Sequence, residues 1–134
     1  MNAKFAELSA RLGEISDLER ARAVLSWDRS TYMPPAGAEA RAAQVATLTR
    51  IAHARFISDA IGQLLDDLEV EFSGSEYDSY EASLVRATRR KYDRERKLSS
   101  QLVAELKKAT ALGESAWEKA RETSDFDAFR PHLQ

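Results

Sequence analysis

Apolar residues recur at helical spacing along most of the chain, and no stretch alternates between apolar and polar residues as an exposed strand would. The clearest run lies within residues 3–27, where apolar side chains three and four positions apart share one face. That face consists of Phe5, Leu8, Leu12, Ile15, Leu18, Ala21 and Leu25. The pattern predicts an all-α protein that starts with a long helix.

About five further helices are expected, which makes an array of about six. A second helix over residues 38–56 has Val45, Leu48, Ile51 and Ala52 inward. Ser58 and Asp59 are suitable caps for a short third helix that buries Ile61, Leu64, Leu65 and Leu68. Ser73-Gly74-Ser75 predicts a loop before a fourth helix, over residues 76–97, which carries Tyr77, Tyr80, Leu84, Ala87 and Tyr92.

The last third of the chain predicts two or three helices. Ser99 or Ser100 is expected to cap the fifth, and its packing residues are Leu102, Val103, Leu106 and Ala109. Gly113 either divides this helix from the segment that bears Trp117 or lies within one continuous helix. Asp125 is expected to cap a final helix. No C-terminal cap signal follows, which indicates a truncated chain.

The segment 28–37 separates the first two predicted helices. Pro34 and Pro35 cannot lie inside a helix, and the residue before each proline is disfavoured in the helical region. Trp27 is predicted to anchor this crossover in the core. Asp28 and Arg41 flank the short rigid segment, and we expect them to form an ion pair that fixes the angle between the helices.

A second local pair lies in the predicted fifth or sixth helix. Trp117 and Arg121 are four residues apart, so the indole and the guanidinium are expected on one helix face, where they can stack. Both residues are interpreted as structural or interaction residues.

Composition excludes several classes of protein. The 134 residues are 43% hydrophobic and 31% charged, with a formal net charge of −2 and no cysteine. Disulfides and thiolate metal sites are therefore excluded, and no overall positive field attracts nucleic acid. No N-terminal leader pattern and no apolar run of about 20 residues are found. A soluble cytoplasmic protein of one domain, with no membrane partner, is the resulting expectation.

Charged residues nevertheless fall into two blocks. Seven acidic residues lie between Asp66 and Glu81 with no basic residue among them, and seven basic residues follow between Arg86 and Lys97. The basic block is compatible with a nucleic-acid surface, but its positive charges spread around the helix and do not form a stripe. A solvated helix face is therefore the preferred interpretation, and no nucleic-acid partner is predicted.

Candidate chemistry is sparse. A zinc peptidase helix needs His-Glu-x-x-His, with two imidazoles one turn apart and a carboxylate beside the metal-bound water. The chain has two histidines, His53 and His132, and neither belongs to such a motif. The five glycines form no phosphate-binding loop, and no glycine-rich elbow surrounds a serine. The sequence therefore predicts no catalytic residue and no metal ligand.

One stretch carries a family resemblance. Residues 25–28 read Leu-Ser-Trp-Asp and are followed by Thr31-Tyr32-Met33-Pro34, then by an Ala- and Arg-rich helix that ends near His53. Matches continue with Arg86-x-x-x-Arg90-x-Tyr92-Asp93, Ala116-Trp117-x-x-Ala120-Arg121 and Asp125-Phe126-x-x-Phe129. In order and spacing these residues resemble the N-terminal region of the thermostable, Taq-type metallocarboxypeptidases. Ser99 departs from the pattern, because relatives often have proline there.

The resemblance implies an all-helical, homodimeric peptidase about four times this length. Such an enzyme removes C-terminal residues from peptides with zinc or cobalt on a His-Glu-x-x-His helix, which lies downstream of these residues. Residues 1–134 are then expected to form a single helical N-terminal domain or fragment that flanks the active-site groove. This segment is expected to be inactive alone, and its partners are the remainder of the chain or a second copy.

The alternative interpretation is a stand-alone helical dimerisation or interaction module derived from that family. Under either interpretation, the residues singled out for structural or interaction roles are Trp27, Asp28, Pro34, Arg41, Trp117 and Arg121.

Overall fold

The computed structural model describes residues 2–133, and within that range the chain is helical without any strand. The elements are α1 (Ala3–Thr31), η1 (Pro35–Gly37), α2 (Ala38–Phe56), α3 (Asp59–Glu71), α4 (Tyr80–Glu95), α5 (Ser100–Thr123), α6 (Phe126–Phe129) and η2 (Arg130–Leu133), where η denotes a 3-10 helix. The predicted all-α class with a long first helix is confirmed.

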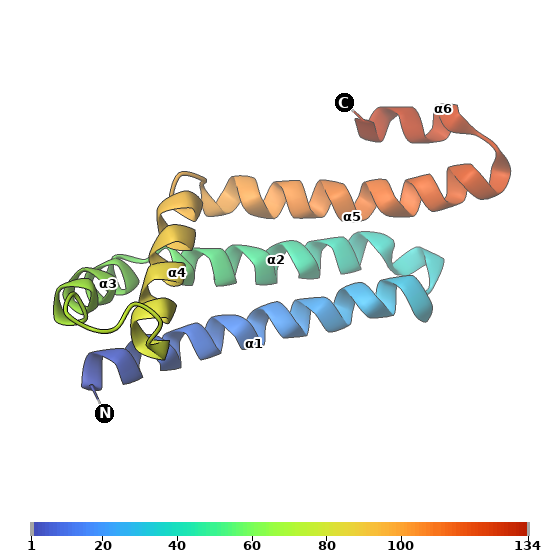
Figure 1. Ribbon diagram of the computed structural model, residues 1–134. Coiled ribbons are helices and arrows are strands. Elements are labelled where there is room, and N and C mark those ends of the chain that lie inside the picture. Colours follow the sequence, from blue (N-terminus) through green and yellow to red (C-terminus); the bar gives the residue numbers. More distant parts are fainter. Residues whose placement is uncertain (1, 134) are drawn as a thin grey trace.

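Three long helices form one layer. Figure 1 shows α1, α2 and α5 side by side with α2 in the middle, and the chain direction alternates from one to the next. The helices α3 and α4 lie at one end of this layer, beside the first turns of α1. At the other end the chain reverses after α5, so that α6 and η2 lie against α5.

The first helix is capped as well as amphipathic. The side-chain oxygen of Asn2 accepts hydrogen bonds from the backbone N–H of Lys4 at 2.9 Å and of Phe5 at 3.1 Å. Phe5, Leu8 and Ile15 are buried on the predicted face. The helix reaches Thr31, four residues beyond the predicted end at Trp27. The backbone leaves the helix at Tyr32 and Met33, before Pro34, so the proline does not prevent the preceding turn from continuing to Thr31.

The main core lies where α1, α2, α3 and α4 meet. Its largest fully buried side chains are Leu8, Ile61, Leu65, Leu68 and Val85. The third helix therefore buries the face that its spacing predicted.

A close approach between α3 and α4 needs a glycine. The Tyr92 hydroxyl donates to the Ser58 carbonyl at 3.3 Å and passes directly over Gly62. A Cβ at position 62 would lie 2.5 Å from that hydroxyl oxygen. The missing side chain at Gly62 leaves the space that the Tyr92 ring and hydroxyl occupy against α3.

Two predictions about the fourth helix are wrong. It begins at Tyr80 and not at residue 76, because Ser79 provides the cap by accepting from the Ala82 N–H. Its buried face contains Ala82, Val85, Thr88 and Tyr92, so of the expected aromatic residues Tyr92 is buried, whereas Tyr77 lies before the helix and Tyr80 is exposed.

The fifth helix differs from expectation in its packing. It continues through Gly113, which was one of the two alternatives, and Ser99 and Asp125 cap α5 and α6 as predicted. Its predicted packing residues Leu102 and Leu106 are exposed, however, because α5 contacts the layer mainly through α2. The predicted helix is present, but the apolar face that contains Leu102 and Leu106 points away from α2.

Ion pairs strengthen the contacts of α3. Arg89 on α4 contacts the carboxylates of Asp66 and Glu69. Partial burial opposes the guanidinium charge, but hydrogen bonds to both carboxylates outweigh it, so the pKa of Arg89 is raised. Lys4 on α1 donates to Asp67 at 2.8 Å, and this hydrogen bond raises the pKa of Lys4. Carboxylates of the acidic block thus balance the positive charges of Lys4 on α1 and Arg89 on α4.

Among residues 2–133, none of the helices is both long and apolar enough to cross a bilayer.

Candidate functional site

The connection between α1 and α2 brings together the residues at the centre of the sequence resemblance. Arg41 Nη1 lies 2.5 Å from Asp28 Oδ2 and also donates to the Leu25 carbonyl at 3.0 Å. Both side chains are largely shielded from solvent, with 19% of Arg41 and 32% of Asp28 exposed. The expected ion pair is present, and it joins the last turns of α1 to the first turn of α2.

Trp27 does not anchor this connection in the core. Its side chain is 59% exposed and packs edge to face on the exposed Tyr32, with ring centroids 5.8 Å apart. The predicted burial is wrong because α1 continues past this residue, and the helical face toward α2 there carries Leu25 and Asp28. Pro34, also exposed, precedes η1 and fixes the extended backbone at its start.

A second ionic contact at this end links α1 to α5. Arg29 Nη2 lies 2.5 Å from Glu114, and Nη1 lies 3.7 Å from Glu118. The Arg29 side chain is only 14% exposed. Sequence reasoning missed this pair, because nothing in the sequence relates positions 29 and 114. The adjacent Asp28 and Arg29 thus connect α1 to α2 and to α5.

Trp117 and Arg121 stack as their spacing predicted, with the guanidinium carbon 5.3 Å from the indole centroid. Trp117 lies at the edge of a shallow pocket between α5 and the terminal helices, with Leu106, Phe129 and His132. The indole keeps 45% of its surface exposed. An exposed aromatic residue of this kind suits contact with another surface.

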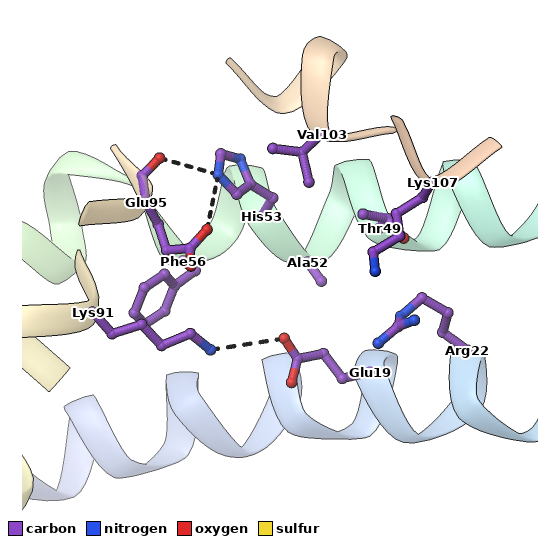
Figure 2. A pocket seen from close by; sticks show the side chains of 10 residues that line it. All are labelled: Glu19, Arg22, Thr49, Ala52, His53, Phe56, Lys91, Glu95, Val103 and Lys107. Atoms are coloured by element: carbon purple, nitrogen blue, oxygen red, sulfur yellow. Dashed lines mark hydrogen bonds and ion pairs between the residues drawn. The ribbon is translucent and has the colours of Figure 1, made fainter. Parts of the chain in front are cut away.

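His53 lies at a different place, near the junction of α2, α4 and α5. Its Nδ1 is 2.8 Å from the Ser100 hydroxyl oxygen, and its Nε2 is 3.2 Å from the Glu95 carbonyl oxygen. Figure 2 shows the imidazole at one end of a cavity that Glu19, Lys91 and Glu95 also line. In the neutral imidazole, the contact with a carbonyl oxygen places the proton on Nε2, and Nδ1 then accepts from the Ser100 hydroxyl.

The side chains that could donate to a metal ion do not form a metal centre within residues 2–133. Within residues 2–133, no three His, Asp or Glu side chains cluster so that they could hold a metal ion. Both nitrogens of His53 are already engaged, and His132 in η2 stacks on Phe129 of α6. A metal of the kind that the resemblance implies does not fit these residues, and no metal-dependent step is derived from them.

Comparison with known proteins gives a consistent result. Residues 7–134 match the model of the carboxypeptidase Taq (M32) metallopeptidase family. The chain is 37% identical over 112 residues to thermostable carboxypeptidase 1 of Thermus thermophilus, covering 84% of this chain and 22% of that protein. It is 30% identical over 123 residues to carboxypeptidase 1 of Bacillus subtilis, covering 92% of this chain and 24% of that protein.

Solved structures agree with the sequence comparisons. The crystal structure of BsuCP superposes with a TM-score of 0.90 at 28% identity, over 98% of this chain and 26% of that one. The structure of CHT gives a TM-score of 0.68 at 35% identity over the same shares. The chain thus spans about a quarter of the length of these relatives. The expected resemblance is confirmed, and the chain belongs to the carboxypeptidase Taq (M32) metallopeptidase family.

Proposed function

We propose that this chain is the N-terminal scaffold of a metal-dependent carboxypeptidase that hydrolyses the C-terminal peptide bond of peptides. The observation that supports this most strongly is the superposition of nearly the whole chain on a quarter of BsuCP. A match of that kind indicates that these helices are one structural part of a larger catalytic fold.

The role that we assign to this part is to support and flank the substrate groove. Asp28, Arg29 and Arg41 form ion pairs that link the three long helices, and no cluster suited to a metal occurs in residues 2–133. Zinc or cobalt, and the His-Glu-x-x-His helix that would hold it, are then supplied by the rest of the enzyme. We expect the complete enzyme to be a cytoplasmic homodimer.

A chimera tests this proposal. The matching segment of Bacillus subtilis carboxypeptidase 1 is replaced by this chain, and release of the C-terminal residue from an N-blocked dipeptide is measured with zinc or cobalt. We expect the chimera to be active and the 134-residue chain alone to be inactive. The same chimera with the motif glutamate changed to Gln serves as the control for background hydrolysis.

Two results would contradict the proposal. One is metal-dependent release of C-terminal residues by the free chain, and the other is a folded, metal-loaded chimera without activity. Protein folding and metal content are checked by circular dichroism and by elemental analysis.

A second candidate function is a helical interaction module that acts without catalysis. The exposed apolar side chains of α5, which include Leu102 and Leu106, favour this candidate. It predicts that the free chain self-associates in sedimentation equilibrium and that Leu102→Asp together with Leu106→Asp abolishes the association. A monomeric wild-type chain would exclude it.

A further inference from the structure

A cavity of about 150 Å³ lies between four helices, at the position drawn in Figure 2. The lining residues are Glu19 and Arg22 from α1, Thr49, Ala52, His53 and Phe56 from α2, Lys91 and Glu95 from α4, and Val103 and Lys107 from α5. The cavity is therefore built by residues distant in sequence, and none of its contacts belongs to the α1–α2 connection described above.

Much of the cavity wall is apolar or already hydrogen-bonded. Ala52, Phe56 and Val103 contribute apolar surface. The Thr49 hydroxyl donates to the Val45 carbonyl at 2.8 Å, and both nitrogens of His53 are engaged. The polar contacts that remain available to a ligand are therefore those of the charged side chains.

Positive charge exceeds negative charge around this cavity. Lys91 lies 3.9 Å from Glu19, and Glu95 is near His53 and Arg94. Within the described residues, Arg22 and Lys107 form no hydrogen bond or ion pair through their side chains, and Figure 2 shows both charged ends directed toward the same part of the cavity. Three cations, Arg22, Lys91 and Lys107, thus line the cavity beside two carboxylates, Glu19 and Glu95, an arrangement that an added anion would stabilise.

From this arrangement we propose that the cavity binds a small organic carboxylate. The carboxylate lies between Arg22 and Lys107, and its apolar group packs on Phe56 and Val103. Charge-assisted hydrogen bonds from a guanidinium and an ammonium are the usual means of holding a carboxylate. A cavity of this order accommodates one benzene ring, which limits the apolar group to that size.

Two sources offer this chemistry: a free small acid and the C-terminal end of a peptide. The proposal does not depend on the peptidase assignment, because it concerns residues of this chain alone. Phenylacetate is the probe for a free acid, and a tripeptide that ends in Phe, compared with its C-terminal amide, is the probe for a peptide terminus.

Binding to the 134-residue chain is measured by isothermal titration calorimetry and by changes in backbone amide NMR signals. We expect saturable binding of phenylacetate and none of its uncharged amide. Arg22→Gln and Lys107→Gln should each weaken binding about tenfold, because each removes one charge-assisted contact. Arg20→Gln and Lys119→Gln, which change exposed cations outside the cavity, should leave binding unaltered.

The result decides both the site and the source. Saturable binding that is weakened only in the two cavity variants supports the proposal. If the peptide that ends in Phe competes with phenylacetate, the ligand is a peptide terminus. If it does not compete, the ligand is a free acid. No saturable binding by the wild-type chain to either acid, or equal binding by all four variants, overturns it. Binding by the wild-type chain is the deciding measurement, so the proposal can be overturned even if a variant fails to fold.

Discussion

Where α3 and α4 lie beside the long helices, large apolar side chains from four helices meet, whereas at the opposite end charged residues and small side chains join α1, α2 and α5. The buried apolar residues at that opposite end are small, such as Ala42 and Ala120. We call these regions the apolar end and the ionic end. Apolar burial contributes far more to stability than partly buried ion pairs do, because desolvation of the two charges offsets much of their attraction. The comparison therefore indicates that the apolar end stabilises the fold and that the ionic end sets the positions of its helices.

The largest effect is expected from a cavity at the apolar end. Leu65 is fully buried, so Leu65→Ala should lower the free energy of unfolding by about 3 kcal/mol, within the range observed for core leucines. Leu106→Ala, at a position that is 64% exposed, is the matched control and should cost less than about 1 kcal/mol. Urea unfolding followed by circular dichroism measures both. Similar losses for the two variants would contradict the assignment of the core.

A smaller loss is expected where α3 meets α4. Gly62→Ala places a methyl group against the Tyr92 hydroxyl and should cost about 2 kcal/mol by overpacking. Adding Tyr92→Phe removes the clashing oxygen, so the double variant should recover part of the loss. Gly13→Ala, which has open space around it in α1, should instead stabilise the protein by up to about 1 kcal/mol. Thermal unfolding of the four proteins distinguishes these expectations.

At the ionic end the partly buried pair should matter more than an exposed one. Arg41→Ala is expected to cost about 1–2 kcal/mol, because Asp28 loses its partner in a poorly solvated position. Arg55→Ala removes an exposed pair with Glu14 and should cost less than about 0.5 kcal/mol. A double-mutant cycle with Asp28→Asn isolates the coupling between the two residues. Equal costs for Arg41→Ala and Arg55→Ala would refute the distinction.

The smallest effect concerns pH. The hydrogen bond that Lys4 donates to the Asp67 carboxylate raises the pKa of Lys4 in the folded protein, so folding favours the protonated amine. Its stabilising contribution is complete below the unfolded pKa of about 10.5 and is lost as pH rises through the higher folded value. The difference in melting temperature between the wild type and Lys4→Met should shrink between pH 9 and pH 11.5. A difference that is independent of pH would show that Lys4 contributes by packing alone.

Much of the fold follows from the sequence because helical period and capping are local. The faces of α1 and α3, the caps Ser99 and Asp125, and the Asp28–Arg41 pair depend on residues close in the chain. Arg29 and Glu114 could not be paired in that way, because only the tertiary arrangement of α1 and α5 brings them together.

The errors have a related physical cause. Periodicity shows that a helix has an apolar face but does not show what covers it, so Leu102 and Leu106 were expected to pack and are exposed. The burial of Trp27 was wrong for a different reason, since it followed from ending α1 too early. The cavity beside His53 combines four helices and has no signature in any one of them.

The length of α1 makes Arg29 and Arg41 important for geometry as well as stability. At 1.5 Å per residue, its 29 residues extend about 43 Å, and the apolar core holds mainly the first half. A tilt of about 5° around that core would displace the far end by about 2 Å, by simple leverage over the remaining half of the helix. The contacts of both arginines lie near the C-terminal end of α1, far from the apolar core, where a given restraining force has the greatest effect on the helix angle. Substituting them should therefore widen the range of orientations that α1 samples while its fixed end stays in place.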